Sequence, residues 1–354
     1  MPNRPSNRIP VTVLGATGVV GQRFVRHLAA HPSFELRYVA ASERSLGKTY
    51  AEACDWRLPG EPYAGFGNMR VVACDPSESP APLVFSALDA GPAREIEPLY
   101  AAAGSLVFSN ASAFRMVEDV PLLVPELNAA HLGLLAVQRA RRGWKGGIVT
   151  NPNCTTVPVA GSLGPLHRVF GAEAAMVVSM QALSGAGYPG VASLDAVANV
   201  IPLIKGEEEK VESESRKILG TFDGEKIVMA PFTISAQCNR VQVIDGHMIA
   251  LNYRLRGSPS PQAVIEALEA FVPDTEGLDL HTAPRRFLQV RMEADRPQPR
   301  RDAEEDGGMR IMVGRVRPCP LFGIKMVALG HNTERGAAGA SILNAELALA
   351  KGLL

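Results

Sequence analysis

The sequence predicts an α/β protein of two domains, a doubly wound parallel sheet followed by a second α+β domain. Three observations support this fold class. The chain has 354 residues, which is long for one hydrophobic core. Short apolar segments alternate with helical patterns up to about residue 150, as strand–helix–strand units do. From about residue 172 the pattern changes to longer alternating segments, which are typical of antiparallel strands.

The first half of the chain has the clearest strand and helix patterns. Residues 9–14 are apolar and rich in β-branched side chains, as expected of a buried parallel strand. A glycine-rich loop follows, and apolar residues then recur at helical spacing from Phe24 to Ala29. Further strands are expected at 34–41, 71–73, 83–88, 106–109 and 148–150, and helices at about 92–103 and 129–142.

Beyond residue 150 the sequence predicts an α+β arrangement. Helices are expected from the 151–156 motif to about 169 and at 191–203, 207–219 and 261–271, and strands at 174–183, 241–244, 248–255, 286–293, 310–317 and 323–329. The charged, Pro- and Gly-rich segment 296–308 is expected to be an exposed loop. We therefore place a first domain at 1–152 and a second at 153–332. The Ala- and Leu-rich tail, about 333–354, is expected to form a helix that returns to the first domain.

Composition limits the class of partner. Lys and Arg number 36 and Asp and Glu number 36, so overall charge favours neither nucleic acid nor an acidic membrane. The five cysteines, at 54, 74, 154, 238 and 319, form no Cys-x-x-Cys pair and lack zinc-ligand spacing, so we expect no metal and a reducing compartment. The sequence shows neither a signal-peptide core nor an apolar stretch of bilayer length, so a cytoplasmic location is expected.

The loop Gly15-x-x-Gly18-x-x-Gly21 lies between the first strand and the first helix. Glycines there permit a tight turn and let backbone N–H groups approach a pyrophosphate at the helix N-terminus. The spacing is not the commonest fingerprint, but its position after the first strand favours a Rossmann-type dinucleotide site over an ordinary glycine-rich turn. The residues assigned to the cofactor here are Gly15, Thr17, Gly18, Val19 and Val20.

The end of the second strand selects the nucleotide. An acid there binds the ribose 2′-OH of NAD, whereas an arginine nearby suits the 2′-phosphate of NADP. Arg44 is flanked by Ser42 and Ser45, so we predict NADP and assign these three residues to it. Glu43 is the counter-argument, and an ordinary surface arginine at position 44 is the alternative.

The run Asn-Pro-Asn-Cys-Thr-Thr at 151–156 follows a strand and begins a helix. Positive potential at a helix N-terminus lowers the pKa of a cysteine, and its N–H groups can stabilise the oxyanion of a tetrahedral intermediate. Cys154 is therefore the predicted nucleophile, which forms a thioester that hydride transfer interconverts with a thiohemiacetal. A buried structural role is the usual alternative, and it fits the other four cysteines.

His247 is the best of the seven histidines as proton partner of the thiol, because it follows Arg240 by seven residues across a strand end. A lone histidine is nevertheless more often structural or exposed than catalytic. Asn153 and Gln181 are candidates for polar support beside the sulfur, although Gln181 could equally be an ordinary polar residue on a strand. The residues expected to line the nicotinamide pocket, in the glycine-rich segment 184–190, are Ser184 and Gly185.

Together these segments resemble the aspartate-semialdehyde dehydrogenases, in the form found in archaea, fungi and some bacteria. The resemblance covers nearly the whole chain and is highly specific. It runs through segments 15–24, 109–116, 151–156, 181–190, 206–210, 238–247 and 331–346, in that order. The stretches 184–190 and 206–220 resemble the archaeal-type branch rather than the usual bacterial one.

The resemblance implies a role for each matching residue. Cys154 is then the acyl-thioester nucleophile, His247 the general acid/base, and Gln181 the residue that orients the intermediate. Arg240 binds the substrate α-carboxylate, which suits a bidentate guanidinium. Asn332 reaches the nicotinamide carboxamide.

The resemblance also implies how the charged ends of the substrate are held. Glu207 faces the substrate ammonium, with Glu208 as the alternative because three glutamates in a row leave the register open. The residues that hold the phosphate are Lys210 and Arg115, with Asn110 or Asn153 nearby. The alternative for the glutamates is a solvated helix face, which is common for acidic runs. The alternative for Arg115 is an ordinary surface residue.

The reaction implied is reductive dephosphorylation of 4-phospho-L-aspartate to L-aspartate 4-semialdehyde with NADPH, in lysine, threonine, methionine and diaminopimelate biosynthesis. The expected partners are this small substrate and phosphate, in a homodimer or homotetramer, without nucleic acid or membrane. The nearest alternative is a malonyl- or succinyl-coenzyme A reductase on the same scaffold, which needs room for pantetheine. The second alternative is a dinucleotide-binding protein without catalytic activity.

Overall fold

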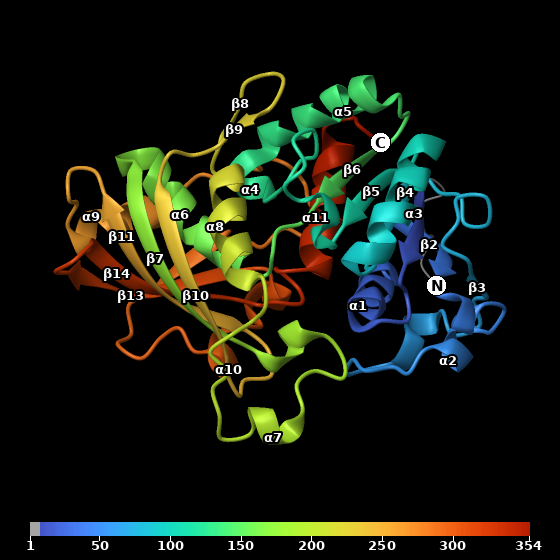
Figure 1. Ribbon diagram of the computed structural model, residues 1–354, viewed down its shortest axis with the longest axis horizontal. Helices are drawn as coiled ribbons and strands as arrows, with labels where there is room; N and C mark the ends of the chain where they lie inside the picture. The colour runs from blue at the N-terminus through green and yellow to red at the C-terminus, as the bar shows by residue number, and fades with distance from the viewer. Residues whose placement is uncertain (1–7) are drawn as a thin grey trace.

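The computed structural model describes residues 8–354, which contain two six-stranded sheets lying side by side (Figure 1). The first sheet is wholly parallel, with the order β3-β2-β1-β4-β5-β6. Its strands are β1 (Ile9–Leu14), β2 (Phe34–Ala40), β3 (Val71–Val72), β4 (Leu83–Ser86), β5 (Leu106–Ser109) and β6 (Gly147–Thr150). Every strand predicted in this half is present, and the Rossmann-type parallel sheet is confirmed.

Helices cover both faces of the first sheet. They are α1 (Val19–Leu28), α2 (Tyr50–Ala53), α3 (Ala90–Ala103), α4 (Pro125–Asn128), α5 (Leu134–Arg142) and α11 (Ala338–Ala350). Alternate strand residues point to opposite faces, so Val11 and Val13 pack with α1 and α11, while Leu14 packs with Tyr100 of α3. The C-terminal helix α11, red in Figure 1, therefore lies on this sheet. The domain limits at 152 and 332 stay a prediction.

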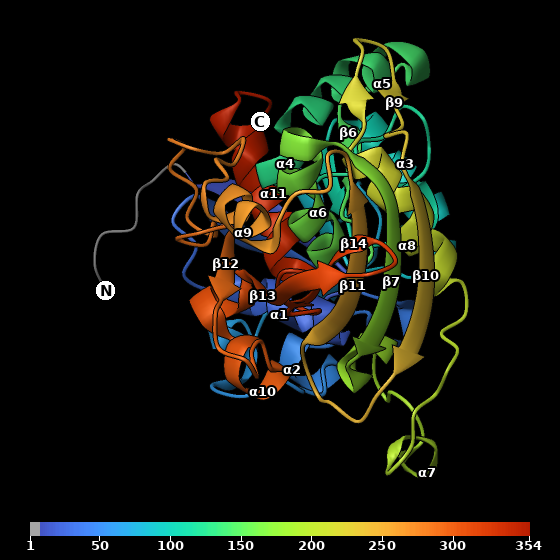
Figure 2. The ribbon, with the colours of Figure 1, turned by 90° about the vertical axis from the view of Figure 1, so that its left-hand side faces the viewer.

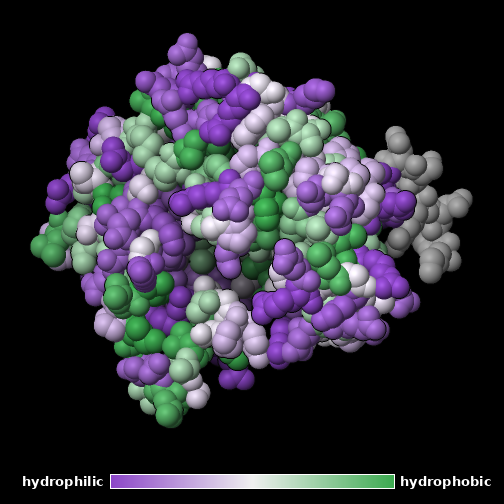
Figure 3. Space-filling view, turned by 45° about the vertical axis from the view of Figure 1, so that its right-hand side comes forward, coloured by the Kyte–Doolittle hydropathy of each residue, from purple (hydrophilic) through white to green (hydrophobic). Residues whose placement is uncertain are grey.

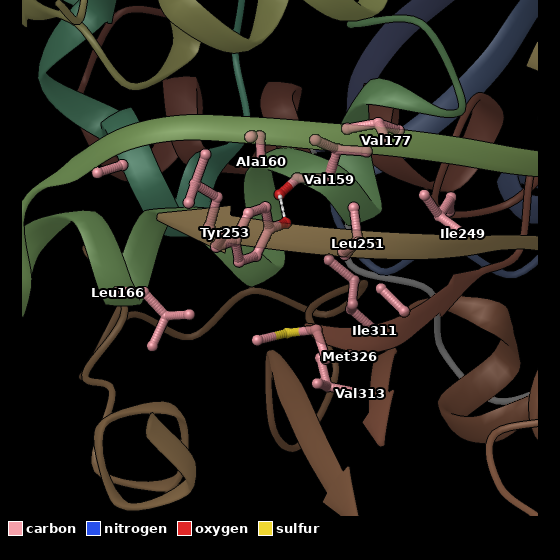
Figure 4. Close-up of a cluster of buried hydrophobic side chains, with 14 of the residues drawn as sticks. Val159, Ala160, Leu166, Val177, Ile249, Leu251, Tyr253, Ile311, Val313 and Met326 are labelled. Atoms are coloured by element: carbon pink, nitrogen blue, oxygen red, sulfur yellow. Dashed lines mark hydrogen bonds between the residues drawn. The ribbon is translucent and has the colours of Figure 1, made fainter. Parts of the chain in front are cut away.

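The second sheet is mixed, with the order β10-β7-β11-β14-β13-β12. Its strands are β7 (Ala172–Gln181), β10 (Thr233–Arg240), β11 (His247–Leu255), β12 (Leu288–Arg291), β13 (Ile311–Cys319) and β14 (Gly323–Gly330); its helices are α6 (Thr156–Phe170), α8 (Glu207–Ile218) and α9 (Pro261–Glu269). A short hairpin joins β8 (Thr221–Phe222) to β9 (Ile227–Val228). Val159 and Leu166 of α6 pack with Leu251 in the core of this half (Figure 4).

The opposite face of the second sheet carries no helix and faces the viewer in Figure 2. Apolar side chains alternate outward along it. Met176, Val178 and Met180 lie on β7, where Met176 is exposed. Ala250 of β11 pairs with Val178 on one side and with Val327 of β14 on the other, so the apolar surface continues across three strands.

The strand expected at 241–244 does not form, and β10, which the sequence pattern missed, ends just before it. β10 is an edge strand whose outward residues, such as Ser235 and Gln237, are polar and exposed, so it lacks an apolar signal. After β10 the backbone forms hydrogen bonds to a loop rather than to a strand. There the Leu183 N–H donates to the Val243 carbonyl at 2.7 Å.

The prediction of a helix at 191–203 is also wrong, because only the short helix α7 (Ser193–Ala196) forms there. Ala198 has a φ of 53°, which ends the helical path. Leu194 is 91% exposed, so hydrophobic burial does not stabilise a longer helix. Figure 3 shows the apolar side chains of this projecting segment at the lower end of the molecule.

The segment 296–308 is not the exposed loop that its composition predicts. It contains α10 (Pro299–Asp302), and Asp302 is buried because it pairs with Arg291 and Arg296. None of the helices between residues 8 and 354 has the length and apolarity needed to cross a lipid bilayer.

Candidate active site

A cavity of about 610 Å³ lies where the loops after β4 and β5 face the N-terminal ends of α1, α6 and α8. The predicted site residues that line it are Val19, Val20, Asn110, Arg115, Asn153, Cys154, Ser184, Gly185, Glu207, Lys210, Arg240 and Asn332. His247 and Gln181 are buried beside Cys154 and Arg240 respectively. The two halves of the chain thus meet at one cavity.

The glycine loop is shaped by two close backbone approaches. Gly15 has a φ of 69°, and a Cβ there would lie 2.8 Å from the Ala87 carbonyl oxygen. A Cβ on Gly21 would lie 2.2 Å from the Gly15 oxygen. Gly18 precedes α1 and contributes no side-chain cap, so the first-turn N–H groups of α1 suit the pyrophosphate of a dinucleotide.

The residues predicted to select NADP lie at the end of β2, away from the cavity lining. Ser42 and Arg44 are exposed and Ser45 is partly exposed, in a single 3₁₀ turn at Glu43–Ser45. An exposed arginine at the carboxyl end of the strand next to β1 suits a 2′-phosphate. Glu43 is exposed as well.

Cys154 and His247 come together although they lie 93 residues apart in the sequence. The Cys154 sulfur lies 3.2 Å from His247 Nε2. The backbone N–H of Ala182 donates to His247 Nδ1 at 3.0 Å, so a neutral imidazole carries its proton on Nε2 and donates it toward the sulfur.

Burial governs the protonation of this pair. Burial of the sulfur, together with the charge of Glu207, raises the pKa of Cys154 to about 12, although Arg115 and Arg240 oppose the shift. Burial and then the charge of Arg240 lower the pKa of His247 to about 3. Burial therefore opposes the thiolate that the helix N-terminus favours, and it opposes a charged imidazole at His247 as well.

The helix amides next to the nucleophile are also less available than expected for an oxyanion. Asn153 Oδ1 accepts from the N–H groups of Thr155 at 2.8 Å and Thr156 at 3.2 Å. The N–H of Asn153 itself donates to Glu214 at 2.6 Å. These bonds fix the nucleophile loop and leave the Cys154 N–H beside its own sulfur.

The raised pKa predicts how Cys154 reacts with iodoacetamide. Only the thiolate is alkylated, and its fraction increases with pH at every value below about 12. Between pH 7 and 9 the rate should rise about tenfold per unit without levelling off. The Cys154→Ala variant gives the background from the other cysteines. A plateau below pH 8 would show a preformed thiolate and contradict the prediction.

Arg240 lies at the end of β10 and is 6% exposed. Its Nη1 donates to the Ala182 carbonyl at 2.8 Å. A Cβ on Gly185 would lie 2.8 Å from this nitrogen and 2.9 Å from His247 Cε1, so the loop can approach the pair only with glycine there. Arg240 also lines the cavity.

The first two glutamates of α8 have different partners. Glu207 lines the cavity, where it accepts from Asn153 Nδ2 at 2.7 Å and lies 3.5 Å from Lys210 Nζ. Glu208 instead accepts from the backbone N–H of Cys238 on β10 at 2.9 Å. Of the two, only Glu207 lines the cavity.

Arg115 is a buried residue, so the surface alternative is wrong. Its Nη1 donates to Glu214 at 3.1 Å, and its Nη2 donates to the Asn110 carbonyl at 2.8 Å. Arg115 and Lys210 both line the cavity and supply positive charge for an anion.

The remaining predicted residues have internal partners. Asn332 Nδ2 donates to Ser184 Oγ at 2.7 Å, and its Oδ1 accepts from the Gly246 N–H at 2.9 Å. Gln181 is 1% exposed and donates to Ser179 Oγ at 3.3 Å, behind the cavity wall. Residues 8–354 contain no group of His, Cys, Asp and Glu that could hold a metal ion.

Two family models match the chain. "Semialdehyde dehydrogenase, NAD binding domain" covers residues 10–135, and "Semialdehyde dehydrogenase, dimerisation domain" covers residues 163–335. The aspartate-semialdehyde dehydrogenase of Archaeoglobus fulgidus is 53% identical over 96% of this chain and 98% of its own. The aspartate-semialdehyde dehydrogenase of Schizosaccharomyces pombe is 46% identical over 97% of this chain and 99% of its own. The chain belongs to the aspartate-semialdehyde dehydrogenase family.

A solved structure of the Candida albicans aspartate-semialdehyde dehydrogenase with NADP matches with a TM-score of 0.90 and 39% identity, over 98% of this chain and all of that one. The relatives are archaeal and fungal aspartate-semialdehyde dehydrogenases, which confirms the branch that the sequence resembles. The comparisons do not favour a coenzyme A reductase.

Two further residues at this site, Gly336 and Glu214, were not predicted from the sequence. Gly336 packs on the nucleophile, since a Cβ there would lie 2.6 Å from Cys154 Cβ. Glu214 connects Arg115 to the nucleophile loop. Its seven-residue spacing from Glu207, which places both on one face of a helix, is the signal that could have found it.

Proposed function

We propose that this chain catalyses the NADPH-dependent reductive dephosphorylation of 4-phospho-L-aspartate to L-aspartate 4-semialdehyde, in lysine, threonine, methionine and diaminopimelate biosynthesis. The 3.2 Å contact between Cys154 and His247, beside a cavity lined by cations and by the carboxylate of Glu207, is the observation that carries the proposal. Membership of the aspartate-semialdehyde dehydrogenase family supports it.

Cys154 is the proposed nucleophile. Its sulfur loses its proton and attacks the acyl carbon. The bond from that carbon to the phosphate oxygen breaks to give a thioester and phosphate, and the proton leaves with the phosphate. NADPH, when bound at the glycine loop, supplies a hydride to the thioester carbon. The carbon–sulfur bond then breaks, which releases the aldehyde and returns the thiolate. Substrate binding favours that thiolate, because an ammonium paired with Glu207 offsets the charge that raises the Cys154 pKa.

His247 is proposed to act through its Nε2–H. Because Nδ1 accepts from the Ala182 amide, the neutral ring donates from Nε2, first to the sulfur and then to the oxyanion that forms on the substrate. Taking up a proton at Nε2 as a general base requires the ring to leave the Ala182 bond. Gln181, buried behind the cavity wall, supports the orientation of the intermediate.

The charged ends of the substrate are assigned to separate groups. Arg240 binds the α-carboxylate and Glu207 the ammonium. Arg115 and Lys210 bind the phosphate, while the amide side chain of Asn153 holds the nucleophile loop. Among the four cations and two carboxylates that line the cavity, the three cations and the one carboxylate assigned here match a small zwitterionic acyl phosphate.

The reverse reaction tests the proposal. Aspartate semialdehyde, inorganic phosphate and NADP should give NADPH with a saturable dependence on phosphate. A reaction that needs coenzyme A and ignores phosphate would instead support the malonyl- or succinyl-coenzyme A reductase.

NADP is the proposed cofactor, with Gly15, Thr17 and Gly18 at its pyrophosphate and Arg44 at its 2′-phosphate. The Arg44→Glu variant should raise the KM for NADP about tenfold or more, because a phosphate-binding cation becomes a repelling anion. The KM for NAD, which lacks this phosphate, should not change. Arg37→Glu, an exposed position in the middle of β2, is the matched control. Equal loss with both cofactors would refute the assignment to Arg44.

The chain carries the dimerisation domain of its family. We propose a homodimer joined through the uncovered face of the second sheet, where Met176, Val178, Ala250 and Val327 are available for burial. Light scattering distinguishes this dimer from a homotetramer. The five free cysteines suit a reducing compartment, and a cytoplasmic location is proposed on that ground.

A further inference from the structure

One face of helix α8 carries charged residues into the interior of the protein. Glu207, Glu214 and Lys217 follow one another at intervals of seven and three residues, so they share this face. Glu214 is 1% exposed and Lys217 is 3% exposed. Buried charges of this kind need specific partners, because removing them from water is costly.

The two carboxylate oxygens of Glu214 have different partners. Oε1 accepts from Arg115 Nη1 at 3.1 Å, and Oε2 accepts from the backbone N–H of Asn153 at 2.6 Å. Asn153 directly precedes Cys154, and Arg115 lines the same cavity as the sulfur. One rigid carboxylate thus joins the cation proposed for the phosphate to the loop that carries the nucleophile.

Lys217 strengthens this connection from the next turn of α8. Its Nζ donates to the backbone carbonyls of Arg115, Val117 and Val120 at 2.7, 2.8 and 2.8 Å. Both the side chain and the backbone of Arg115 are therefore held by α8. Burial raises the pKa of Glu214, and the nearby Arg115 cation and the Asn153 amide oppose this by stabilising its charged form.

We propose that Glu214 is a positioning residue that sets the distance between Arg115 and Cys154, and so aligns the acyl carbon with the sulfur when the phosphate is bound. This inference rests on the proposed function, because it takes Arg115 as a phosphate ligand. Glu214 acts through Arg115 and Asn153 and itself touches no reacting atom.

The proposal separates two kinetic effects of Glu214→Gln. The amide oxygen of Gln can still accept from Asn153, but the anion that holds Arg115 is lost. Phosphate binding should not weaken, because a negative charge has been removed from the phosphate site. Alignment is lost, so kcat of the phosphate-dependent reduction of NADP should fall about tenfold, the usual effect of losing one charge-assisted hydrogen bond. The KM for phosphate should stay the same or fall.

Glu212→Gln is the matched control. Glu212 lies on the same helix and accepts from the backbone N–H of Ala236 at 2.9 Å, outside the cavity lining. Its kcat should equal that of the unchanged protein. A rise in the phosphate KM together with a fall in kcat for Glu214→Gln would indicate general damage to the site and would overturn the positioning role.

A second test repeats Glu214→Gln in an Arg115→Leu background. There Glu214 is a buried carboxylate without its cation, so changing it to Gln should leave kcat unchanged or raise it. The double variant has no buried unpaired charge at this pair, which keeps the test usable if Arg115→Leu alone folds poorly. The same tenfold loss in both backgrounds would overturn the inference while leaving the role of Arg115 intact. A phosphate KM that Arg115→Leu does not raise would remove Arg115 from the proposed function, and the inference with it.

Discussion

Replacement of Cys154 by serine is expected to lower kcat of the phosphate-dependent reduction of NADP by at least about a thousandfold. A serine hydroxyl is a far weaker acid than a thiol and needs a base. The neighbouring imidazole donates from Nε2, because Nδ1 is held by the Ala182 amide, and so offers no base in this arrangement. An oxygen ester is also a poorer hydride acceptor than a thioester.

The measurement follows NADPH formation from aspartate semialdehyde and phosphate, with titration of NADPH to show that the cofactor site persists. Cys319→Ser on β13, whose sulfur lies 3.5 Å from Asn252 Oδ1, is the control and should keep full activity. Appreciable turnover by Cys154→Ser would mean that the reaction does not pass through a thioester.

The parallel sheet could be predicted because its strands are short apolar runs buried on both faces. Residues 9–14 are an example, since their pattern does not depend on distant contacts. The edge strand β10 could not be predicted in this way, because half of its side chains face outward and are polar. The segment 191–203 has an apolar pattern, but Leu194 finds no burial, so pattern alone overestimated the helix.

Motifs pointed to the candidate residues that the structure gathers around one cavity, whereas the protonation state of those residues could not be read from motifs. The position of Cys154 before a helix indicates a nucleophile. Its raised pKa depends on burial and on Glu207, 53 residues away in sequence. The tautomer of His247 likewise depends on one backbone amide, at Ala182. Such long-range contacts leave no local signature in a sequence.

Arg240→Leu is expected to lower kcat/KM for aspartate semialdehyde. The loss should correspond to about 2–5 kcal/mol of transition-state stabilisation. Arg240 is buried and fixed by the Ala182 carbonyl, so its charge is preorganised for a carboxylate. The KM for the semialdehyde should rise, while the KM for phosphate, bound by Arg115 and Lys210, should change little.

Arg240 also lowers the pKa of Cys154, so its loss should slow alkylation of Cys154 at a given pH as well as weaken substrate binding. Arg240→Lys restores this charge but not a planar two-pronged contact, and should recover alkylation better than it recovers kcat/KM. Arg254→Leu, at an exposed position on β11 of the same sheet, should change neither alkylation nor kcat/KM. If Arg240→Leu left kcat/KM unchanged, the carboxylate would have to bind elsewhere. Recovery of both properties by lysine would show that only the charge of Arg240 matters, not its geometry.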